Sequence, residues 1–260
     1  MPTPSPADGA IWITGASSGI GRALALEMAR RGFAVAATAR DAAALASLAA
    51  EGGGKIAAFP GDVTDQAAMD AIVPAIEAAL GPIQIAVLNA GIYLPVRALP
   101  FEHDKFRKSF DVNLMGTVNG LGAIIPAMVA RRRGQIWITS SVAGYGGLPT
   151  SAAYGATKAG LINLAASLWL DLKLADVHVG VINPGFVDTP ATAKNPFEMP
   201  FLMKVEDAAT RIADGFAKPR FEITFPRRFA FLLKAMNLLP YDWYLNLTFR
   251  NTKWGERTLP

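Results

Sequence analysis

Short apolar segments of strand length alternate with longer segments of helix-forming composition along most of this chain, and few folds accommodate that order. The apolar segments read as nearly continuous Val, Ile, Leu and Ala, as strands buried on both faces of a sheet require. They are Ala10–Thr14, Phe33–Ala39, Lys55–Phe59, Ile83–Leu88, Gly134–Thr139, His178–Ile182 and Glu222–Phe225. The helical segments between them are Ile20–Arg31, Ala42–Ala50, Gln66–Leu80, Phe101–Arg131, Tyr154–Leu174 and Val205–Phe216. The pattern predicts a doubly wound α/β fold with a seven-stranded, mostly parallel sheet flanked by helices.

We expect a single domain, because 260 residues suit one doubly wound unit and no repeat, low-complexity tract or linker interrupts the pattern. Residues 1–219 would form its main part. Residues 220–260 would add the last strand and an apolar, basic, helical extension of the same domain.

Composition excludes several classes of protein. The chain is 52% hydrophobic and only 18% charged, which predicts a globular fold and not disorder. It has no cysteine and only two histidines, His103 and His178, so we expect neither a disulfide framework nor a metal site nor a Ser-His-Asp triad. No apolar run reaches the ~18–20 residues of a membrane span, and Met1–Ala10 does not resemble a signal peptide. A cytoplasmic protein is expected.

The net charge of +4 lies entirely in the last part of the chain, where 220–260 holds seven basic and three acidic residues. Outside it the only dense basic cluster is Arg131–Arg133, which is typical of the last turn of a helix, so no nucleic-acid partner is expected. Nine of the 24 Phe, Tyr and Trp residues also fall in these 41 positions. Residues 225–249 could contact a membrane surface, contact another subunit, cover a substrate pocket or pack on their own subunit.

A glycine-rich turn joins the first strand to the first helix, in the spacing G-x-x-x-G-x-G. Such a turn exposes backbone N–H groups at the positive end of a helix, where the pyrophosphate of a dinucleotide can approach closely. The candidate binding residues are Gly15, Ser17, Ser18, Gly19, Ile20 and Gly21.

The second strand is followed by Arg40, at the position that selects between the two nicotinamide dinucleotides. An acidic residue there accepts from the ribose 2′-OH of NAD, whereas an arginine suits the 2′-phosphate of NADP. We therefore expect NADP(H) to be favoured over NAD(H), with Ser17 as a second contact. An ordinary surface arginine is the alternative.

Two further polar motifs follow strands. Asp62 and Val63 come after the third strand, and Asn89, Ala90 and Gly91 come after the fourth. Open α/β sheets bind their ligands at this carboxyl edge. Asp62 could accept from an adenine amino group, or it could cap the helix of Gln66–Leu80, a role that Asp65 or Thr64 could fill instead.

Tyr154 and Lys158 are four residues apart, so they share one face of a helix. A neighbouring ammonium lowers the pKa of a phenol toward the range of general acid–base catalysis. Ser141 follows a strand and could donate to a carbonyl oxygen. Asn113, in the long helix, could hold a backbone carbonyl or a water in a proton relay.

These motifs together resemble the classical short-chain dehydrogenase/reductase family over residues 9–218. The resemblance is carried by TGASSGIG at 14–21, DV at 62–63, NAG at 89–91, Asn113, Ser141, YGATK at 154–158 and NPGFVDT at 183–189. It implies a Rossmann-type sheet and a hydride transfer between a nicotinamide cofactor and a carbonyl or alcohol carbon. In the family pattern Tyr154 exchanges the proton, Lys158 lowers the pKa of Tyr154 and holds the ribose, Ser141 polarises the substrate oxygen and Asn113 completes a tetrad.

The resemblance also places Pro184 and Gly185 under the nicotinamide, with Val187 and Thr189 at its carboxamide. It implies a homodimer or homotetramer paired through the helices of Phe101–Arg131 and Tyr154–Leu174. Apolar contact in that pairing could come from Leu161, Leu164, Ala165, Leu168 and Trp169, which could instead face the sheet.

Substrate choice in such a fold depends on the loops at the carboxyl edge. Here these are 92–95, 145–149, Phe186 and Pro190–Lys204, and the last contains Phe197, Met199, Phe201, Leu202 and Met203. These apolar residues predict an apolar substrate pocket and hence a small apolar ketone or secondary alcohol, although they could equally pack against the C-terminal residues. Apart from Lys194 and Lys204, the loops carry no cationic cluster that would pair with a phosphate or polyanionic substrate. An NAD-dependent alcohol dehydrogenase and a non-catalytic NADP-binding regulator are the alternatives.

Overall fold

The computed structural model of the protein describes residues 4–193, 199–252 and 254. The strands are β1 (Ala10–Thr14), β2 (Val35–Thr38), β3 (Ile56–Ala58), β4 (Ile83–Leu88), β5 (Gly134–Thr139), β6 (Val177–Pro184) and β7 (Glu222–Phe225). The helices are α1 (Gly19–Arg30), α2 (Ala42–Glu51), α3 (Gln66–Leu80), α4 (His103–Ser109), α5 (Gly116–Ala130), α6 (Ala152–Lys173), α7 (Val205–Ala217), α8 (Arg227–Met236) and α9 (Tyr241–Asn251). Shorter helical turns are η1 (Pro6–Asp8), η2 (Phe110–Met115) and η3 (Val142–Gly144).

Over this described part of the chain the strands form one seven-stranded sheet in the order β3-β2-β1-β4-β5-β6-β7. Each of its neighbouring pairs is parallel, so the predicted fold class is confirmed and the sheet is more uniform than "mostly parallel" implied. Strand order reverses between β1 and β4. In a doubly wound sheet this reversal opens a crevice at the carboxyl ends of the strands, where a ligand can bind.

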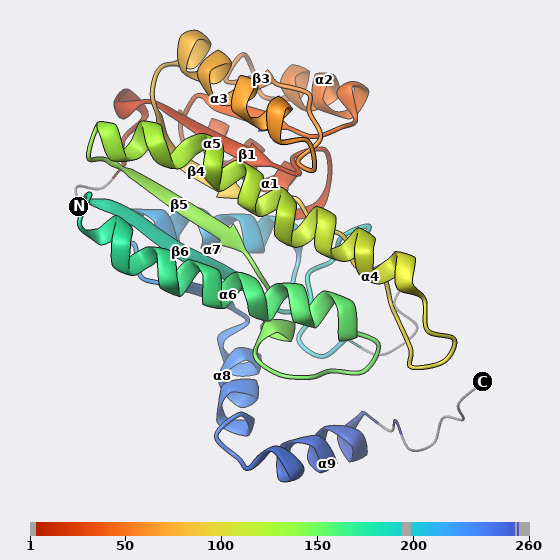
Figure 1. The fold of residues 1–260 in the computed structure, drawn as a ribbon. Coiled ribbons are helices and arrows are strands. Elements are labelled where there is room, and N and C mark those ends of the chain that lie inside the picture. The colour runs from red at the N-terminus through yellow and green to blue at the C-terminus, as the bar shows by residue number, and fades with distance from the viewer. Residues whose placement is uncertain (1–3, 194–198, 253, 255–260) are drawn as a thin grey trace.

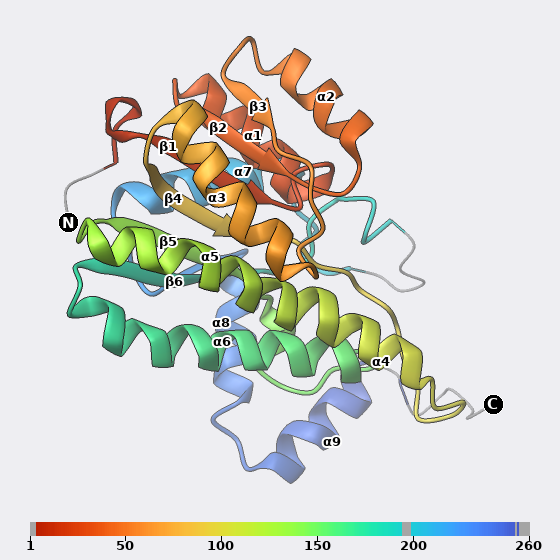
Figure 2. The same ribbon diagram turned by 45° about the horizontal axis from the view of Figure 1, so that its top comes forward.

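Helices cover both faces of the sheet (Figure 1). One face packs against α1, α2 and α7, and the other packs against α3, α5 and α6 (Figure 2). Side chains alternate along β1, where Ile11 and Ile13 belong to the first core and Trp12 to the second. Because the strands bury side chains in both cores, they read as continuous apolar runs in the sequence.

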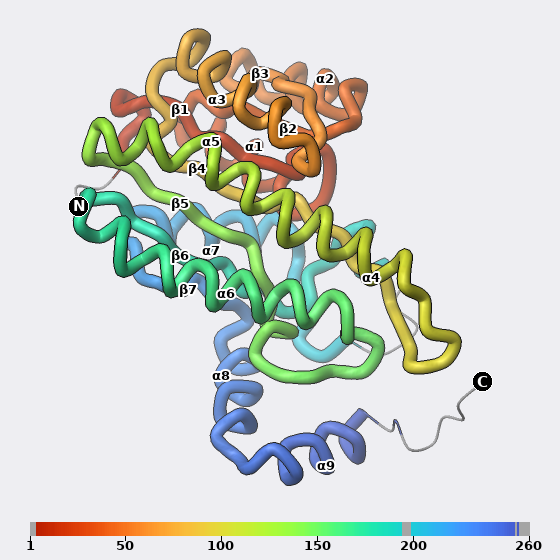
Figure 3. The backbone as a smooth tube through the Cα atoms, viewed as in Figure 1, coloured from red at the N-terminus to blue at the C-terminus, as the bar shows by residue number. Residues whose placement is uncertain are grey.

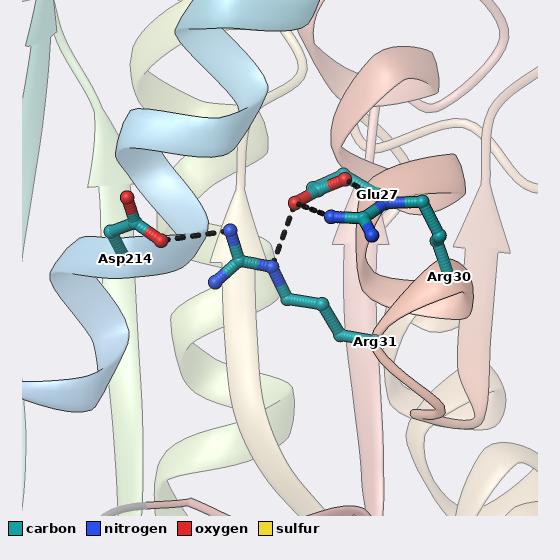
Figure 4. A network of polar contacts seen from close by, with 4 residues as sticks. All are labelled: Glu27, Arg30, Arg31 and Asp214. Atoms are coloured by element: carbon teal, nitrogen blue, oxygen red, sulfur yellow. Dashed lines mark hydrogen bonds and ion pairs between the residues drawn. The ribbon is translucent and has the colours of Figure 1, made fainter.

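A polar network ties α1 to α7 on the outside of the first face (Figure 4). The Arg31 guanidinium donates to Glu27 at 2.7 Å and to Asp214 at 2.8 Å, and Arg30 also donates to Glu27 at 2.8 Å. The hydrogen bond from Arg30 and the ion pair with Arg31 outweigh burial and lower the pKa of the Glu27 carboxyl below its usual value. The network fixes α7 beside the helix that starts at the glycine turn.

The long helix expected over Phe101–Arg131 is interrupted. It begins at His103, and residues Phe110–Met115 form a π-helical segment between α4 and α5. The composition of His103–Ala130 would also satisfy a membrane-spanning helix, contrary to our expectation that no segment would. Here its buried residues, among them Leu121, Ile124 and Met128, pack in the second core with α3 and the sheet.

The residues of α6 that we expected at a subunit interface differ in burial. Leu161 and Ala165 are completely buried against the sheet, and Leu164, Leu168 and Trp169 are partly buried against the same core. The alternative that these residues face the sheet therefore holds for Leu161 and Ala165, which cannot contact another subunit.

The last strand, β7, pairs with β6, and the chain then leaves the sheet as α8 and α9 (Figure 3). Pro226 directly precedes α8, which ends at Met236, and Pro240 directly precedes α9. These two helices form the C-terminal extension that the sequence indicated.

Candidate active site

A cleft of about 370 Å³ lies at the carboxyl edge of the sheet, beside the point where the strand order reverses. Nearly all of the predicted site residues line it, although they come from the ends of six different strands and from the helices α1 and α6. Gly21 and Asn113 do not line the cleft; they contact Gly15 and Ile92, which do. The predicted residues that do line it are Gly15, Ser17, Ser18, Gly19, Ile20, Arg40, Asp62, Val63, Asn89, Ala90, Gly91, Ser141, Tyr154, Lys158, Pro184, Gly185, Val187 and Thr189.

Two glycines shape the turn between β1 and α1. Gly15 has φ of +67°, and a Cβ added there would lie 2.7 Å from Ala90 Cα. A Cβ on Gly21 would lie 2.4 Å from the backbone oxygen of Gly15. Only glycine gives this close packing of turn, helix and neighbouring loop without strain. The start of α1 at Gly19 therefore faces the cleft with its first backbone N–H groups, at the positive end of the helix.

The Asn89-Ala90-Gly91 segment holds this turn in place. The backbone N–H groups of Asn89 and Ala90 donate to the Thr14 hydroxyl at 2.9 and 3.1 Å, and the Asn89 amide donates to the Thr14 carbonyl at 3.1 Å. Thr14 was not singled out from the sequence. Its position as the last residue of β1, directly before the glycine turn, was the available signal.

Arg40 and Asp62 lie together at one end of the cleft, with 3.9 Å between the guanidinium and the carboxylate. Both side chains are exposed enough to meet a ligand. Asp65 caps α3 by accepting from Ala68 N–H at 3.1 Å, so Asp62 is not needed for that role, and it accepts instead from Thr64 within its own turn. Asp41, which we did not consider, also lines the cleft, but its carboxylate caps α2 by accepting from Ala44 N–H at 2.9 Å.

Tyr154 and Lys158 occupy one face of α6, as their spacing predicted. The Lys158 ammonium is buried, donates to the Thr139 carbonyl oxygen at 2.7 Å and lies 5.4 Å from the centre of the Tyr154 ring. Burial lowers the pKa of Lys158 to about 8. Burial also raises the pKa of Tyr154, while the hydrogen bond with the Ser141 side chain acts in the opposite direction. In the protein alone, burial therefore outweighs the lowering of the Tyr154 pKa that we expected from Lys158.

Ser141 follows β5 and faces Tyr154. Its hydroxyl accepts from Ala143 N–H at 3.1 Å, which caps the short helical turn η3, and it lies 3.4 Å from the Pro184 carbonyl oxygen. These contacts fix the hydroxyl between the Tyr154 phenol and the Pro184-Gly185 segment at the end of β6.

Asn113 is fully buried in the π-helical segment. Its amide oxygen accepts from Ile92 N–H at 2.7 Å, and its amide nitrogen donates to Ile92 O at 3.0 Å and to the Thr157 hydroxyl at 3.2 Å. Thr117 donates to the Asn113 carbonyl at 2.8 Å. A π segment rotates a side chain relative to a regular helix, and such segments are frequent at functional sites. Asn113 therefore connects the loop after Gly91 to the helix that carries Tyr154 and Lys158.

The residues after β6 form the remaining wall. Val187 pairs with Met203 in an isolated parallel bridge, and Thr192 donates to the Val187 carbonyl oxygen at 2.5 Å. The Thr189 hydroxyl lies 3.2 Å from that of Thr192. Of the loop expected over Pro190–Lys204, Lys194 and Phe197 lie outside the described residues.

The cleft has the features that a nicotinamide dinucleotide requires. A helix N-terminus and glycines without side chains face one part, a cation lies at the end where an adenosine would sit, and a tyrosine and a lysine lie at the other end. Among the described residues there is no group of three or more His, Asp or Glu side chains that could hold a metal ion. The fold and the site thus define a dinucleotide-binding oxidoreductase.

The chain belongs to the short chain dehydrogenase family, whose model matches residues 9–199. It is 38% identical to an uncharacterised oxidoreductase of Myxococcus xanthus over 231 residues, covering 88% of this chain and 91% of that one. It is 34% identical to the 3-oxoacyl-(acyl-carrier-protein) reductase of Thermotoga maritima over 211 residues, covering 80% and 84%.

A solved structure shows the same fold. The 3-oxoacyl-(acyl-carrier protein) reductase of Brucella melitensis superimposes with a TM-score of 0.73 at 28% identity, covering 83% of this chain and 88% of that one. The family identified from the motifs is therefore confirmed, and with it an oxidoreductase that uses NAD(P).

Proposed function

We propose that this protein is an NADP(H)-dependent reductase or dehydrogenase that interconverts a carbonyl and a secondary alcohol of a small apolar substrate. The observation that carries the proposal is the convergence of Ser141, Tyr154 and Lys158 at one end of the cleft, opposite the glycine turn. Each of the three is held by contacts to a different part of the scaffold, so the group is rigid before any ligand binds.

The chain's own residues supply proton transfer and orientation. When NADPH is bound, it supplies the hydride that reduces the carbonyl carbon. The Tyr154 hydroxyl donates its proton to the carbonyl oxygen, and the Ser141 hydroxyl donates a hydrogen bond to the same oxygen. The Lys158 cation stabilises the phenolate that Tyr154 becomes. Alcohol oxidation uses the same groups in reverse, with Tyr154 accepting the proton.

The raised pKa of Tyr154 suits the reductive direction. A phenol buried in this way keeps its proton at neutral pH and can deliver it when the substrate oxygen becomes basic. Asn113 binds both the Ile92 loop and Thr157 of α6, so it fixes their relative position and acts as a positioning residue.

Preference for NADP(H) over NAD(H) rests on Arg40 at the cleft end. Its guanidinium is largely exposed, and its one described carboxylate neighbour, Asp62, is 3.9 Å away, too far for a strong ion pair. The carboxylate of Asp41, the next residue in the chain, is engaged in capping α2. A 2′-phosphate would therefore meet an available cation.

An apolar substrate is favoured by the aromatic rings around the tetrad. The Tyr93 ring lies edge-on to Tyr154 with 5.2 Å between centroids, and Phe186 stacks with Phe229 of α8 at 5.7 Å. We also propose a homodimer or homotetramer, for which the exposed Leu170 of α6 and Leu174 directly after it are better candidates than the buried Leu161. Light scattering at micromolar concentration tests it, and a monomer contradicts it.

The test of the activity is a panel of apolar ketones and secondary alcohols, followed by absorbance of NADPH. Wild type should turn over at least one compound, and Tyr154→Phe should lose at least about 100-fold in kcat while binding NADPH normally. Tyr93→Phe is the matched control, since it keeps the neighbouring ring and removes a hydroxyl whose described hydrogen bond is with Thr150. If wild type and Tyr154→Phe both bind NADPH and neither turns over any compound, the regulator interpretation replaces the enzyme.

A further inference from the structure

The C-terminal extension presents large apolar side chains to solvent. Phe231 on the outer side of α8 is 77% exposed, Leu238 in the following turn is 87% exposed, and Tyr241 and Trp243 at the start of α9 are 83% and 68% exposed. Together with Leu232 they form a surface that we call the apolar tip. Single exposed apolar residues are ordinary, but several large ones in one short segment mark an interaction site.

The orientation of this surface is fixed, because the opposite sides of α8 and α9 are docked. Ala230 and Leu233 pack on Val142, beside Ser141. The Asn237 amide donates to the Tyr145 carbonyl at 2.5 Å, and the Tyr244 hydroxyl donates to the Gly147 carbonyl at 2.9 Å.

A half-buried carboxylate anchors the base of α8. Glu222 on β7 pairs with Lys234 and accepts hydrogen bonds from Tyr145 and, at 2.6 Å, from the Asn183 amide. Burial raises the pKa of the Glu222 carboxyl, but the hydrogen bonds from Lys234, Tyr145 and Asn183 and the charge of Lys234 together outweigh it, so the pKa is lowered. Packing on the same subunit, one of the alternatives for residues 225–249, is therefore present, and it leaves the apolar tip uncovered.

Basic residues flank the apolar tip along the chain. Between 226 and 252 the sequence has four basic residues and one acidic residue, Asp242. Lys234 is paired with Glu222, whereas Arg227, Arg228 and Arg250 form no ion pair with any of the described residues. In Figure 1 α8 and α9 lie at the bottom of the molecule, on the side away from α2, and in Figure 2 α9 again lies at the bottom edge.

We propose that the apolar tip docks on the surface of an anionic lipid bilayer. Aromatic and leucine side chains enter the interface, and the unpaired arginines meet lipid phosphates. A second copy of this chain would bring the same arginines toward one another across a two-fold axis, with only Asp242 in this segment to oppose them. Charge complementarity therefore favours lipid over a second copy.

Insertion is confined to α8, the turn and the first residues of α9. Asp242, Asn246 and Arg250 follow one another at helical spacing on the side of α9 opposite the buried Tyr244 and Thr248. A helix with that polar stripe does not sink into hydrocarbon. Binding is expected to be peripheral, reversible and sensitive to salt.

The docked edge adjoins the substrate end of the cleft. Phe229 of α8 stacks on Phe186, which follows the Pro184-Gly185 wall, and Tyr244 of α9 holds the loop after Tyr145. A protein held to a bilayer by this edge would have its substrate loops close to the lipid surface. An apolar substrate dissolved in the bilayer could then reach the cleft over a short distance, a consequence that rests on the proposed function.

The experiment is sedimentation of the full-length protein with phosphatidylcholine vesicles, with and without about one third phosphatidylglycerol, at low ionic strength and in about 1 M NaCl. We expect binding to the anionic vesicles at low salt, a loss of at least about 10-fold in high salt, and little binding to phosphatidylcholine alone. Phe231→Ser combined with Leu238→Ser should reduce binding at least about 10-fold, and so should Arg227→Glu combined with Arg228→Glu.

The control is Leu99→Ser, which changes an exposed leucine before α4, outside both the apolar tip and the proposed subunit contact, and should leave vesicle binding unchanged. Thermal melting and NADPH titration verify that each variant is folded. Absence of binding to anionic vesicles at low salt, or equal binding by the two tip variants and wild type, overturns the proposal. A change of oligomeric state in the Phe231 and Leu238 variant, with no vesicle binding by wild type, assigns the surface to a second copy. Because this experiment measures vesicle binding, a negative result contradicts the membrane proposal and leaves the proposed enzymatic activity untouched.

Discussion

The ammonium group of Lys158 donates a hydrogen bond to the backbone carbonyl oxygen of Thr139 at 2.7 Å, and this contact joins α6 to the end of β5. Thr139 is the residue two before Ser141, so one strand end positions both the lysine and the serine. Because the ammonium is buried with no carboxylate partner among the described residues, its pKa falls to about 8. The charge of Lys158 is therefore lost within the range of an ordinary pH profile.

The titration of Lys158 predicts that kcat for ketone reduction falls at alkaline pH. Below pH about 8 Lys158 is cationic and stabilises the phenolate formed when Tyr154 gives up its proton; above it the cation is lost and kcat should fall. Lys158→Arg keeps the positive charge at higher pH, so the pH at which kcat falls should rise in this variant, even if its maximal rate is lower. Lys158→Met should lower kcat at least about 100-fold at all pH values. If kcat falls at the same pH in Lys158→Arg as in wild type, another group is responsible for the decrease.

Arg40 is predicted to select the cofactor. Arg40→Asp removes an attraction of about 1.5–3 kcal/mol to the 2′-phosphate and adds a repulsion, so NADPH binding should weaken by at least about 10-fold while NADH binding is kept or improved. Calorimetric titration of both cofactors measures the change. Arg211→Asp, an exposed position on α7, is the control and should alter neither affinity. Tighter binding of NADH than NADPH by the unmodified protein would refute the assignment.

Gly21 is predicted to tolerate no side chain. A methyl group there would lie 2.4 Å from the Gly15 carbonyl oxygen, which is backbone and cannot move aside without distorting the turn. Gly21→Ala should cost about 1–3 kcal/mol of folding free energy and reduce NADPH affinity at least about 10-fold.

The control is Gly122→Ala on α5, where an added methyl group meets nothing within 4 Å. It should stabilise the protein by about 0.5–1 kcal/mol because alanine favours a helix interior over glycine. Chemical unfolding and cofactor titration of both variants give the comparison. Equal behaviour of the two alanine variants would show that the turn is not packed as described.

His178 is predicted to make stability fall in mild acid. It is buried beside Trp137, and burial lowers the pKa of its imidazole to about 4. Between pH about 6.5 and about 4 the unfolded chain binds a proton that the folded chain does not, so folding stability decreases as the pH falls through this window. The free energy of unfolding should fall by about 1–2 kcal/mol. This is less than the whole difference between the folded and unfolded pKa of His178 would give, because the ring keeps some contact with solvent.

Urea unfolding at pH 7 and pH 4.5 measures this loss. His178→Phe should make the two free energies of unfolding more nearly equal, while His103→Phe, at an exposed position, should leave the difference as in wild type. If the His178 and His103 variants lose stability equally on acidification, His178 is not the group responsible.

The sequence by itself determined the elements and their order. Strand and helix patterns depend on the period of apolar residues within one segment, so β1, β4, β5 and β7 begin and end where expected. The glycine turn and the spacing of Tyr154 and Lys158 are also local. Because parallel strands place their carboxyl ends at one edge, local positions were enough to bring most of the predicted site residues into a single cleft.

Only the tertiary structure decided how those residues are held and what they face. The contacts of Lys158 with Thr139, of Asn113 with Ile92, and of Glu222 with Asn183 join residues far apart in sequence. The burial of Leu161 follows from which side of α6 meets the sheet. No local period encodes such pairings, because they depend on packing between elements, and packing also set the pKa of Lys158 and left the outer side of α8 uncovered.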